Sequence, residues 1–133
     1  MRSKNKENID IRYYSDEELD AMDPEKAYRL AFISEQNEVL RRLGLSKKQM
    51  HNYWYKRVDY DFPEGITYKC EDRAKFLKEW KELDSIYTSG YNSYFYEEDS
   101  YYLYKKDDLL MLYNRSYAEG DGTDHFFTVF KNE

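Results

Sequence analysis

Residues 94–113 of the chain read YFYEEDSYYLYKKDDLLMLY. Here and up to residue 131, runs of aromatic or aliphatic residues alternate with short charged or glycine-containing segments. The apolar runs are 94–96, 101–104, 109–113 and 126–130, and the segments between them include 97–99, 105–108 and 119–122. Short β-prone runs separated by turn-forming residues predict an antiparallel meander of three or four strands.

The run at 109–113 is apolar at every position, so both of its faces require burial. We therefore expect it to form a central strand, with helices covering one face of the sheet. The acidic triplet at 97–99 is expected to form a hairpin turn, because it interrupts the aromatic runs on either side of it.

Capping signals predict one short helical turn and two helices before the strands. A capping box at residues 15–18 opens the short turn. The Asp-Pro pair at 23–24 begins the first helix, and Gly44 ends it. A second capping box, at 46–49, begins a helix that runs to about residue 57. Beyond these, an apolar stripe predicts a third helix over roughly 71–85.

Helices that come before the strands, without alternation of the two, predict an α+β fold. In it, N-terminal helices and a third helix pack on a C-terminal antiparallel β-meander. We expect a single domain over residues 1–133. Its helical part covers about 15–85, its β part covers about 91–131, and residues 1–12 form a flexible segment.

The composition favours a compact intracellular protein. The 133 residues include one cysteine, and the formal net charge is −6 at pH 7. A mean hydropathy of −1.06 excludes a membrane span, and the N-terminal sequence holds no apolar stretch typical of a secretory signal. We therefore expect a cytoplasmic protein without a membrane partner. Aromatic residues make up 19% of the chain, which is enough to build a core without disulfides.

Signals for catalysis are weak. Asp121, Asp124 and His125 stand close together in the segment EGDGTDHF, and these residue types bind metals or transfer protons. Glycine on both sides of Asp121 is more typical of a hairpin turn, and the spacing does not match a calcium loop. The sequence also lacks a phosphate-binding glycine loop and a two-histidine zinc helix, so we expect no enzymatic activity, no metal and no cofactor.

The strongest local motif lies in a basic segment. Residues 39–57 carry six basic and no acidic residues, whereas 15–38 carry two basic and eight acidic residues. Residues 36–55 read QNEVLRRLGLSKKQMHNYWY and resemble a helix-turn-helix segment, with Gly44 at the turn and Ser46 capping the second helix. Leu40 stands where such segments usually carry a small residue.

As a helix-turn-helix, residues 36–57 would serve a DNA-binding transcriptional regulator. Its second helix would present amide side chains to base edges, and basic side chains would meet phosphates. The candidate nucleic-acid contacts are Arg41, Arg42, Lys47, Lys48, Gln49, Asn52, Lys56 and Arg57, with His51 on the same exposed part. A helical hairpin with solvated charges, or a basic surface that binds protein, explains the same pattern.

Tyrosine supplies the second candidate surface. The chain has 16 tyrosines, and within 94–104 they fall at odd and even positions, so some rings must point away from the core. Tyrosine suits protein interfaces because its ring is apolar and its hydroxyl is polar. Together with the neighbouring acidic residues, these rings predict a finger that enters a basic cleft. The candidate partner contacts are Tyr94, Tyr96, Glu97, Glu98, Asp99, Tyr102 and Tyr104.

In size, acidity and cysteine content the chain resembles phage-encoded inhibitors and toxin-immunity proteins, a similarity of overall character that rests on no motif. The leading prediction is a non-enzymatic inhibitor or immunity protein of a phage or mobile element. It would mask a basic surface of a nucleic-acid-associated protein partner. Two other interpretations stay open: tyrosines that only build a half-exposed sheet, and rings that stack on single-stranded bases, which the nearby carboxylates disfavour.

Overall fold

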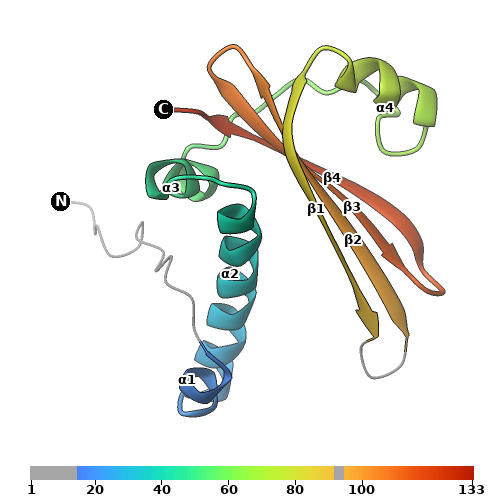
Figure 1. The fold of residues 1–133 in the computed structure, drawn as a ribbon. Helices are drawn as coiled ribbons and strands as arrows, with labels where there is room; N and C mark the ends of the chain where they lie inside the picture. The colour runs from blue at the N-terminus through green and yellow to red at the C-terminus, as the bar shows by residue number, and fades with distance from the viewer. Residues whose placement is uncertain (1–14, 92–94) are drawn as a thin grey trace.

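The computed structural model describes residues 15–91 and 95–133 and has an α+β fold (Figure 1). Within these residues the helices are α1 Asp16–Asp20, α2 Pro24–Arg42, α3 Lys47–Tyr55 and α4 Cys70–Leu77. The strands are β1 Lys81–Tyr91, β2 Tyr96–Lys106, β3 Leu109–Ala118 and β4 Gly122–Lys131. The prediction of an antiparallel meander after the helices is confirmed. The segment expected to be flexible, 1–12, lies outside the described residues.

The four strands pair in chain order, and every pair is antiparallel. Two residues join β2 to β3, and the first of them, Asp107, has a φ of 55°. The turn between β3 and β4 contains Gly120, and Gly122 follows it, with φ values of 92° and 87°. Glycine adopts such values without the steric cost that other residues have. The turn predicted at 119–122 is therefore confirmed.

Strand β3 is central and is buried on both faces of the sheet. Leu110 and Leu112 point into a core formed with α2 and α3, on what we call the α2–α3 face. Met111 and Tyr113 point the other way, into a core formed with α4 and residues 58–66, on the α4 face. The expected central strand is confirmed, and helices cover one face as expected; α4 and residues 58–66 cover part of the other face as well, because a strand that is apolar on both sides needs cover on both sides.

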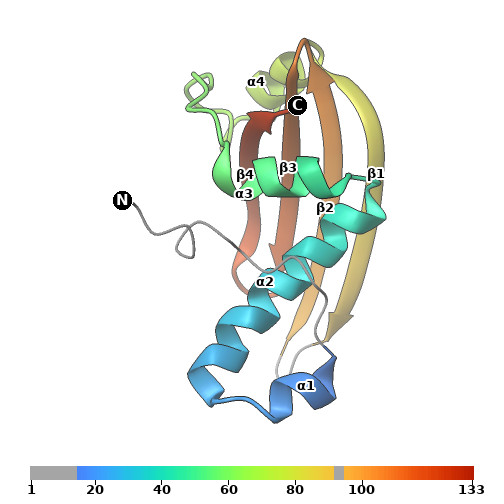
Figure 2. The same ribbon diagram turned by 90° about the vertical axis from the view of Figure 1, so that its left-hand side faces the viewer.

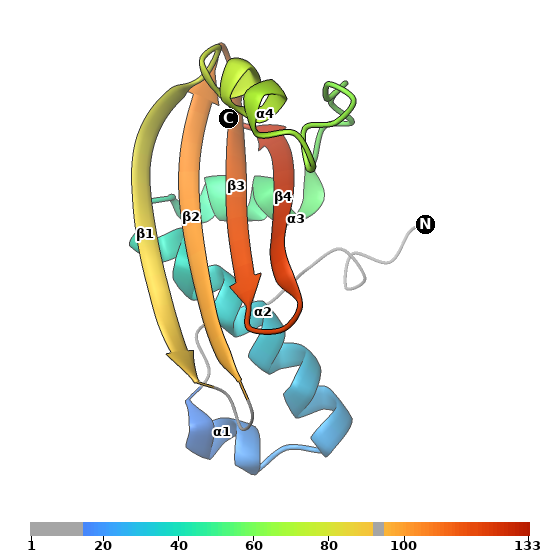
Figure 3. The same ribbon diagram turned by 90° about the vertical axis from the view of Figure 1, so that its right-hand side faces the viewer.

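The two faces are covered to different extents. Helix α3 lies across the strands on one face, as Figure 2 shows. On the opposite face α4 lies over one end of the sheet, and no other described helix lies over the remainder (Figure 3). The described helices therefore leave the half of the α4 face that is distant from α4 uncovered.

The helix ends follow the predicted capping signals. The side chains of Ser15 and Ser46 accept hydrogen bonds from the backbone N–H three residues ahead, and both capping boxes are complete. Asp23 caps α2 in the same way, and Gly44 follows its C-terminal end with a φ of 87°. No described helix is long and apolar enough to span a membrane.

The third helix is shorter than the sequence predicts. A helix was expected over 71–85, but α4 ends at Leu77, and the chain continues as β1 from Lys81. Residues 81–85 have mostly helix-compatible side chains, yet they pair with β2, and Ile86 packs against the α2–α3 core. Pairing with a distant strand therefore overrides local propensity here. The β part begins at residue 81 rather than near 91.

The acidic triplet Glu97-Glu98-Asp99 does not form a turn. Strand β2 is continuous from Tyr96, and the last pair of the first hairpin joins Tyr91 to Tyr96. The connection between these strands therefore precedes the acidic residues, which lie within a strand. The predicted finger with an acidic tip is wrong.

Trp80 packs in the α4-side core with Met111 and Tyr113, and Leu77 packs against the same core, as predicted. Replacing Trp80 with alanine should lower the free energy of unfolding by about 3–5 kcal/mol, because it opens a cavity among aromatic neighbours. Leu83 is an exposed apolar residue at the β1 bulge and is the matched control. Denaturant melts should show a loss below about 1 kcal/mol for Leu83→Ala. Equal losses for the two variants would contradict this packing.

Candidate functional site

The residues expected to form one partner-binding surface lie on both faces of the sheet. Side chains alternate along β2, so consecutive residues point in opposite directions. The α4 face carries Tyr96, Glu98 and Tyr102, and the α2–α3 face carries Glu97 and Asp99. Tyr104 is buried in the α4-side core, and Tyr94 lies outside the described residues. Only part of the predicted set therefore shares one accessible face.

A tyrosine patch lies on the uncovered half of the α4 face and consists of Tyr87, Tyr91 and Tyr96 around Glu98. Tyr87 donates a hydrogen bond of 2.9 Å to the Glu98 carboxylate, and Tyr96 donates another of 2.8 Å to the same oxygen. The rings of Tyr91 and Tyr96 lie 5.1 Å apart between centroids. Tyr87 is 54% exposed and Tyr91 is 81% exposed, so large aromatic surfaces face solvent.

The hydrogen bonds of the tyrosine patch fix its charge. The bonds with Tyr87 and then Glu98 raise the pKa of Tyr96 to about 12. The hydroxyls of Tyr96 and Tyr87 lower the pKa of Glu98 below its ordinary value, because they stabilise the carboxylate. At neutral pH the patch therefore carries an ionised Glu98 carboxylate beside a neutral Tyr96 hydroxyl.

The end of the sheet that carries this patch is strongly acidic. Glu119 of the β3–β4 turn accepts a hydrogen bond from the backbone N–H of Tyr96 and donates its own N–H to the Tyr96 carbonyl. These bonds join the two hairpin ends. The acidic residues gathered there are Glu97, Glu98, Asp99, Glu119, Asp121 and Asp124. We call this set the acidic end. Arg115 of β3 lies on the same half of the sheet and pairs across the strands with Ser100 and His125.

An aromatic row connects the tyrosine patch with α4. Tyr113 stacks on Tyr102 and on Phe127, with ring centroids 5.4 Å and 4.6 Å apart. The Tyr113 hydroxyl forms a hydrogen bond of 2.8 Å with His125 Nδ1. Burial, together with Arg73 and Arg115, lowers the pKa of His125 below its ordinary value. At neutral pH this part of the face is therefore a rigid aromatic surface, with histidine mainly uncharged.

The basic segment forms the predicted pair of helices, but α3 is packed on the sheet. Leu43, Met50 and Tyr53 are buried in the α2–α3 core, and Val39 packs against it, as the motif predicts. The side of α3 that faces solvent carries Lys47, Lys48 and His51, while Arg42, Lys56 and Arg57 are also exposed. The exposed side is therefore basic, and the opposite side holds the fold together.

The two amide side chains expected to read bases have structural contacts instead. Asn52 is buried, and its amide donates a hydrogen bond of 3.2 Å to the backbone carbonyl of Lys131 and another to that of Glu133. Gln49 completes the capping box at Ser46 and donates a bond of 2.8 Å to Asn132. The expectation that Asn52 lies on the exposed part of α3 is wrong, because the C-terminal strand end covers it.

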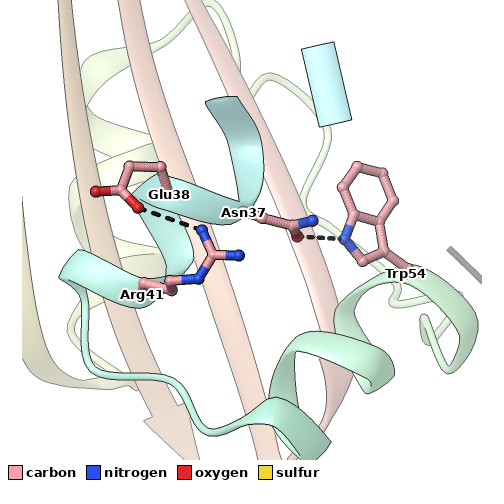
Figure 4. Close-up of polar contacts among 4 residues, drawn as sticks. All are labelled: Asn37, Glu38, Arg41 and Trp54. Atoms are coloured by element: carbon pink, nitrogen blue, oxygen red, sulfur yellow. Dashed lines mark hydrogen bonds and ion pairs between the residues drawn. The ribbon is translucent and has the colours of Figure 1, made fainter. Parts of the chain in front are cut away.

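Polar contacts also fix the junction of α2 and α3 (Figure 4). Trp54 Nε1 donates a hydrogen bond of 2.7 Å to the buried Asn37 side chain, which ties the two helices together. Arg41 forms an ion pair of 3.2 Å with Glu38 one turn earlier in α2. A positive charge of the basic segment is thus partly neutralised within its own helix.

A groove lies between α2, α3 and the sheet. Its volume is about 480 Å³, and its walls include Phe32 of α2, Trp54 of α3 and Phe126 of β4. Arg57 lines it as well, with its guanidinium 4.7 Å from the centre of the Tyr53 ring. Phe32 and Phe126 are 64% and 54% exposed, so the groove is aromatic, and no side chain of the described residues fills it.

The acidic and histidine residues of the β3–β4 hairpin do not form a metal site. Asp124 and His125 are neighbours in β4, so they point to opposite faces of the sheet, and Asp121 lies in the turn. Among the described residues, no group of three or more histidine, cysteine or carboxylate side chains is arranged to hold a metal.

Several residues of these surfaces were absent from the predicted sets. Tyr87 and Tyr91 belong to β1, part of which was predicted as helix, so their pairing with β2 could not be expected. Glu119, Asp121 and Asp124 join the acidic end through strand register, which depends on where each hairpin turns. For Phe32 the sequence does hold a signal. A phenylalanine beside charged positions of a helix belongs either to the core or to a contact surface.

Comparisons of the chain with protein-family models, with curated proteins and with solved structures give no match. The function must therefore be inferred from the geometry and chemistry of the surfaces described above.

Replacing Asn52 with alanine should destabilise the fold by about 1–3 kcal/mol, because the buried amide and its hydrogen bonds to the C-terminal backbone are lost. Thermal or denaturant melts provide the measurement. Lys48→Ala, on the exposed side of the same helix, should change stability by less than about 0.5 kcal/mol. A stable Asn52→Ala protein would show that this amide is not a structural tie.

Proposed function

We propose that this chain is a non-enzymatic binding protein that covers a basic surface of a protein partner with its tyrosine patch and acidic end. The observation that carries the proposal is the coincidence of the two features. Three tyrosines surround an ionised Glu98 on a half-face that no described helix covers, and six carboxylates gather at the same end of the sheet.

The patch has the properties of an interface centre. Exposed tyrosine rings offer large apolar contact area, and their hydroxyls remain able to form hydrogen bonds. Hydrogen bonds to Glu98 hold two of the rings in place, so a partner would meet a largely preorganised surface. Little side-chain entropy would then be lost on binding.

The acidic end favours a basic partner. Six carboxylates stand near one arginine, so the local field attracts cations and repels nucleic-acid backbones. Clefts of nucleic-acid-binding enzymes present such basic surfaces, and covering one would inhibit access of the nucleic acid. An inhibitor or immunity protein of a phage or mobile element would work in this way.

Two variant pairs test the proposal after capture of partners from nuclease-treated cell extract with the full chain. Tyr87→Ser with Tyr91→Ser should speed dissociation and cost about 2 kcal/mol or more, because the rings supply the short-range contacts. Glu97→Lys with Asp121→Lys should slow association and reduce its salt dependence, because these exposed charges steer encounter. Surface plasmon resonance separates the two rates.

Matched control variants carry the same kinds of substitution at exposed residues outside the tyrosine patch and the acidic end. Tyr68→Ser removes a tyrosine that is 91% exposed outside the patch, and Asp59→Lys with Glu64→Lys reverses two exposed acids in a loop. These variants should bind as the unmodified chain does. The proposal fails if patch and control variants have the same kinetics, or if nuclease treatment removes every captured partner.

Duplex DNA is the alternative partner, supported by the shared exposure of Lys47, Lys48 and His51 on α3. Because Asn52 and Gln49 are held in structural hydrogen bonds, this face would contact phosphates rather than read bases. Such binding must weaken steeply as salt rises, and Lys47→Glu with Lys48→Glu must abolish it. Fluorescence anisotropy with a labelled duplex at low salt tests this alternative. If the unmodified chain does not bind the duplex, the alternative is removed.

A further inference from the structure

The first half of α2 exposes an aromatic stripe. Tyr28 and Phe32 lie one turn apart on the same side of the helix and are 80% and 64% exposed. The α2 residues assigned to the α2–α3 core are Val39 and Leu40, near its C-terminal end, and Leu43 caps that end. Figure 1 shows the helix diverging from the sheet toward α1. The stripe is therefore apolar surface that the described part of the chain does not cover.

The groove beside this stripe is its structural complement. Phe32 forms one wall of the groove, and Trp54 and Phe126 form others. A volume of about 480 Å³ can receive aromatic side chains from outside. One chain therefore carries both a projecting aromatic stripe and an aromatic groove, which is the condition for a self-complementary contact.

Charge is divided along the same helices. Residues 15–38, which form α1 and most of α2, carry eight acidic and two basic residues, and 39–57 carry six basic and no acidic residues. Glu17 and Asp20 are exposed on α1, and Lys47 and Lys48 are exposed at the start of α3. If two α2 helices lie antiparallel, the acidic end of each comes beside the basic end of the other.

We propose that the occupant of this groove is a second copy of the chain. The two α2 helices pack antiparallel about a two-fold axis, and Tyr28 and Phe32 of each copy insert into the groove of the other. Acidic α1 of one copy then faces basic α3 of its partner at both ends of the contact. The tyrosine patch lies on the opposite face of the sheet, so this inference is independent of the proposed function.

Sedimentation velocity on the full chain, from micromolar to millimolar concentration, tests the dimer directly. We expect a reversible monomer–dimer equilibrium. Tyr28→Ser with Phe32→Ser should weaken the dimer at least about tenfold, a cost of about 1.4 kcal/mol. Tyr68→Ser changes a ring that is 91% exposed elsewhere and should leave the equilibrium unchanged. Circular dichroism confirms that each variant is folded.

A charge exchange tests the antiparallel arrangement. Lys47→Glu with Lys48→Glu makes both ends of a homodimer acidic, and Glu17→Lys with Asp20→Lys makes both ends basic. Each double variant alone should dimerise more weakly than the unmodified chain. Mixed together they should form a heterodimer, because every acidic end then meets a basic end.

Three results would overturn the proposal. These are an unmodified chain that stays monomeric at millimolar concentration, a stripe variant that dimerises as tightly as the Tyr68 control, and mixed charge variants that do not associate. If neither the stripe variant nor the charge variants change the dimerisation equilibrium, the dimer forms through another surface. Loss of partner binding by the patch variants would not affect these measurements, so the two proposals fail separately.

Discussion

Burial of β3 on both faces is the constraint on which the rest of the structure depends. Leu110 and Leu112 require α2 and α3 on one side, and Met111 and Tyr113 require α4 and residues 58–66 on the other. The helix available for the second side has eight residues and lies over one end of the sheet. The remainder of that face must therefore tolerate water, and it does so with tyrosine, serine and charged side chains.

Local signals account for the helices and turns that could be predicted. Caps at Ser15, Asp23 and Ser46 act within one turn of helix, and Gly44 ends α2 through its own backbone, so sequence alone locates them. Strand β1 could not be located in this way. Its first residues have helix-compatible side chains, and only pairing with β2 makes them a strand. That pairing joins distant positions and leaves no local pattern.

The candidate surfaces, too, could be predicted where the signal was local and could not be predicted where it depended on strand pairing. Tyrosine enrichment and the acidic triplet were visible in the sequence, but the position of the hairpin turn was not. Once β2 is continuous from Tyr96, alternation alone assigns Glu98 to the tyrosine patch and Glu97 to the opposite face. Asn52 shows the same limit, because the backbone that buries it comes from residues 131 and 133, far along the chain.

The two proposed contacts use opposite faces of the sheet, and their combination has a consequence for affinity. The groove opens on the α2–α3 face, whereas the tyrosine patch lies on the α4 face. A two-fold dimer built through the groove would therefore carry two patches, both free to bind. If a partner offers two basic surfaces within reach, the second contact becomes intramolecular and its effective concentration rises. A patch of three tyrosines and one carboxylate could then hold its partner more tightly than its small area alone would allow.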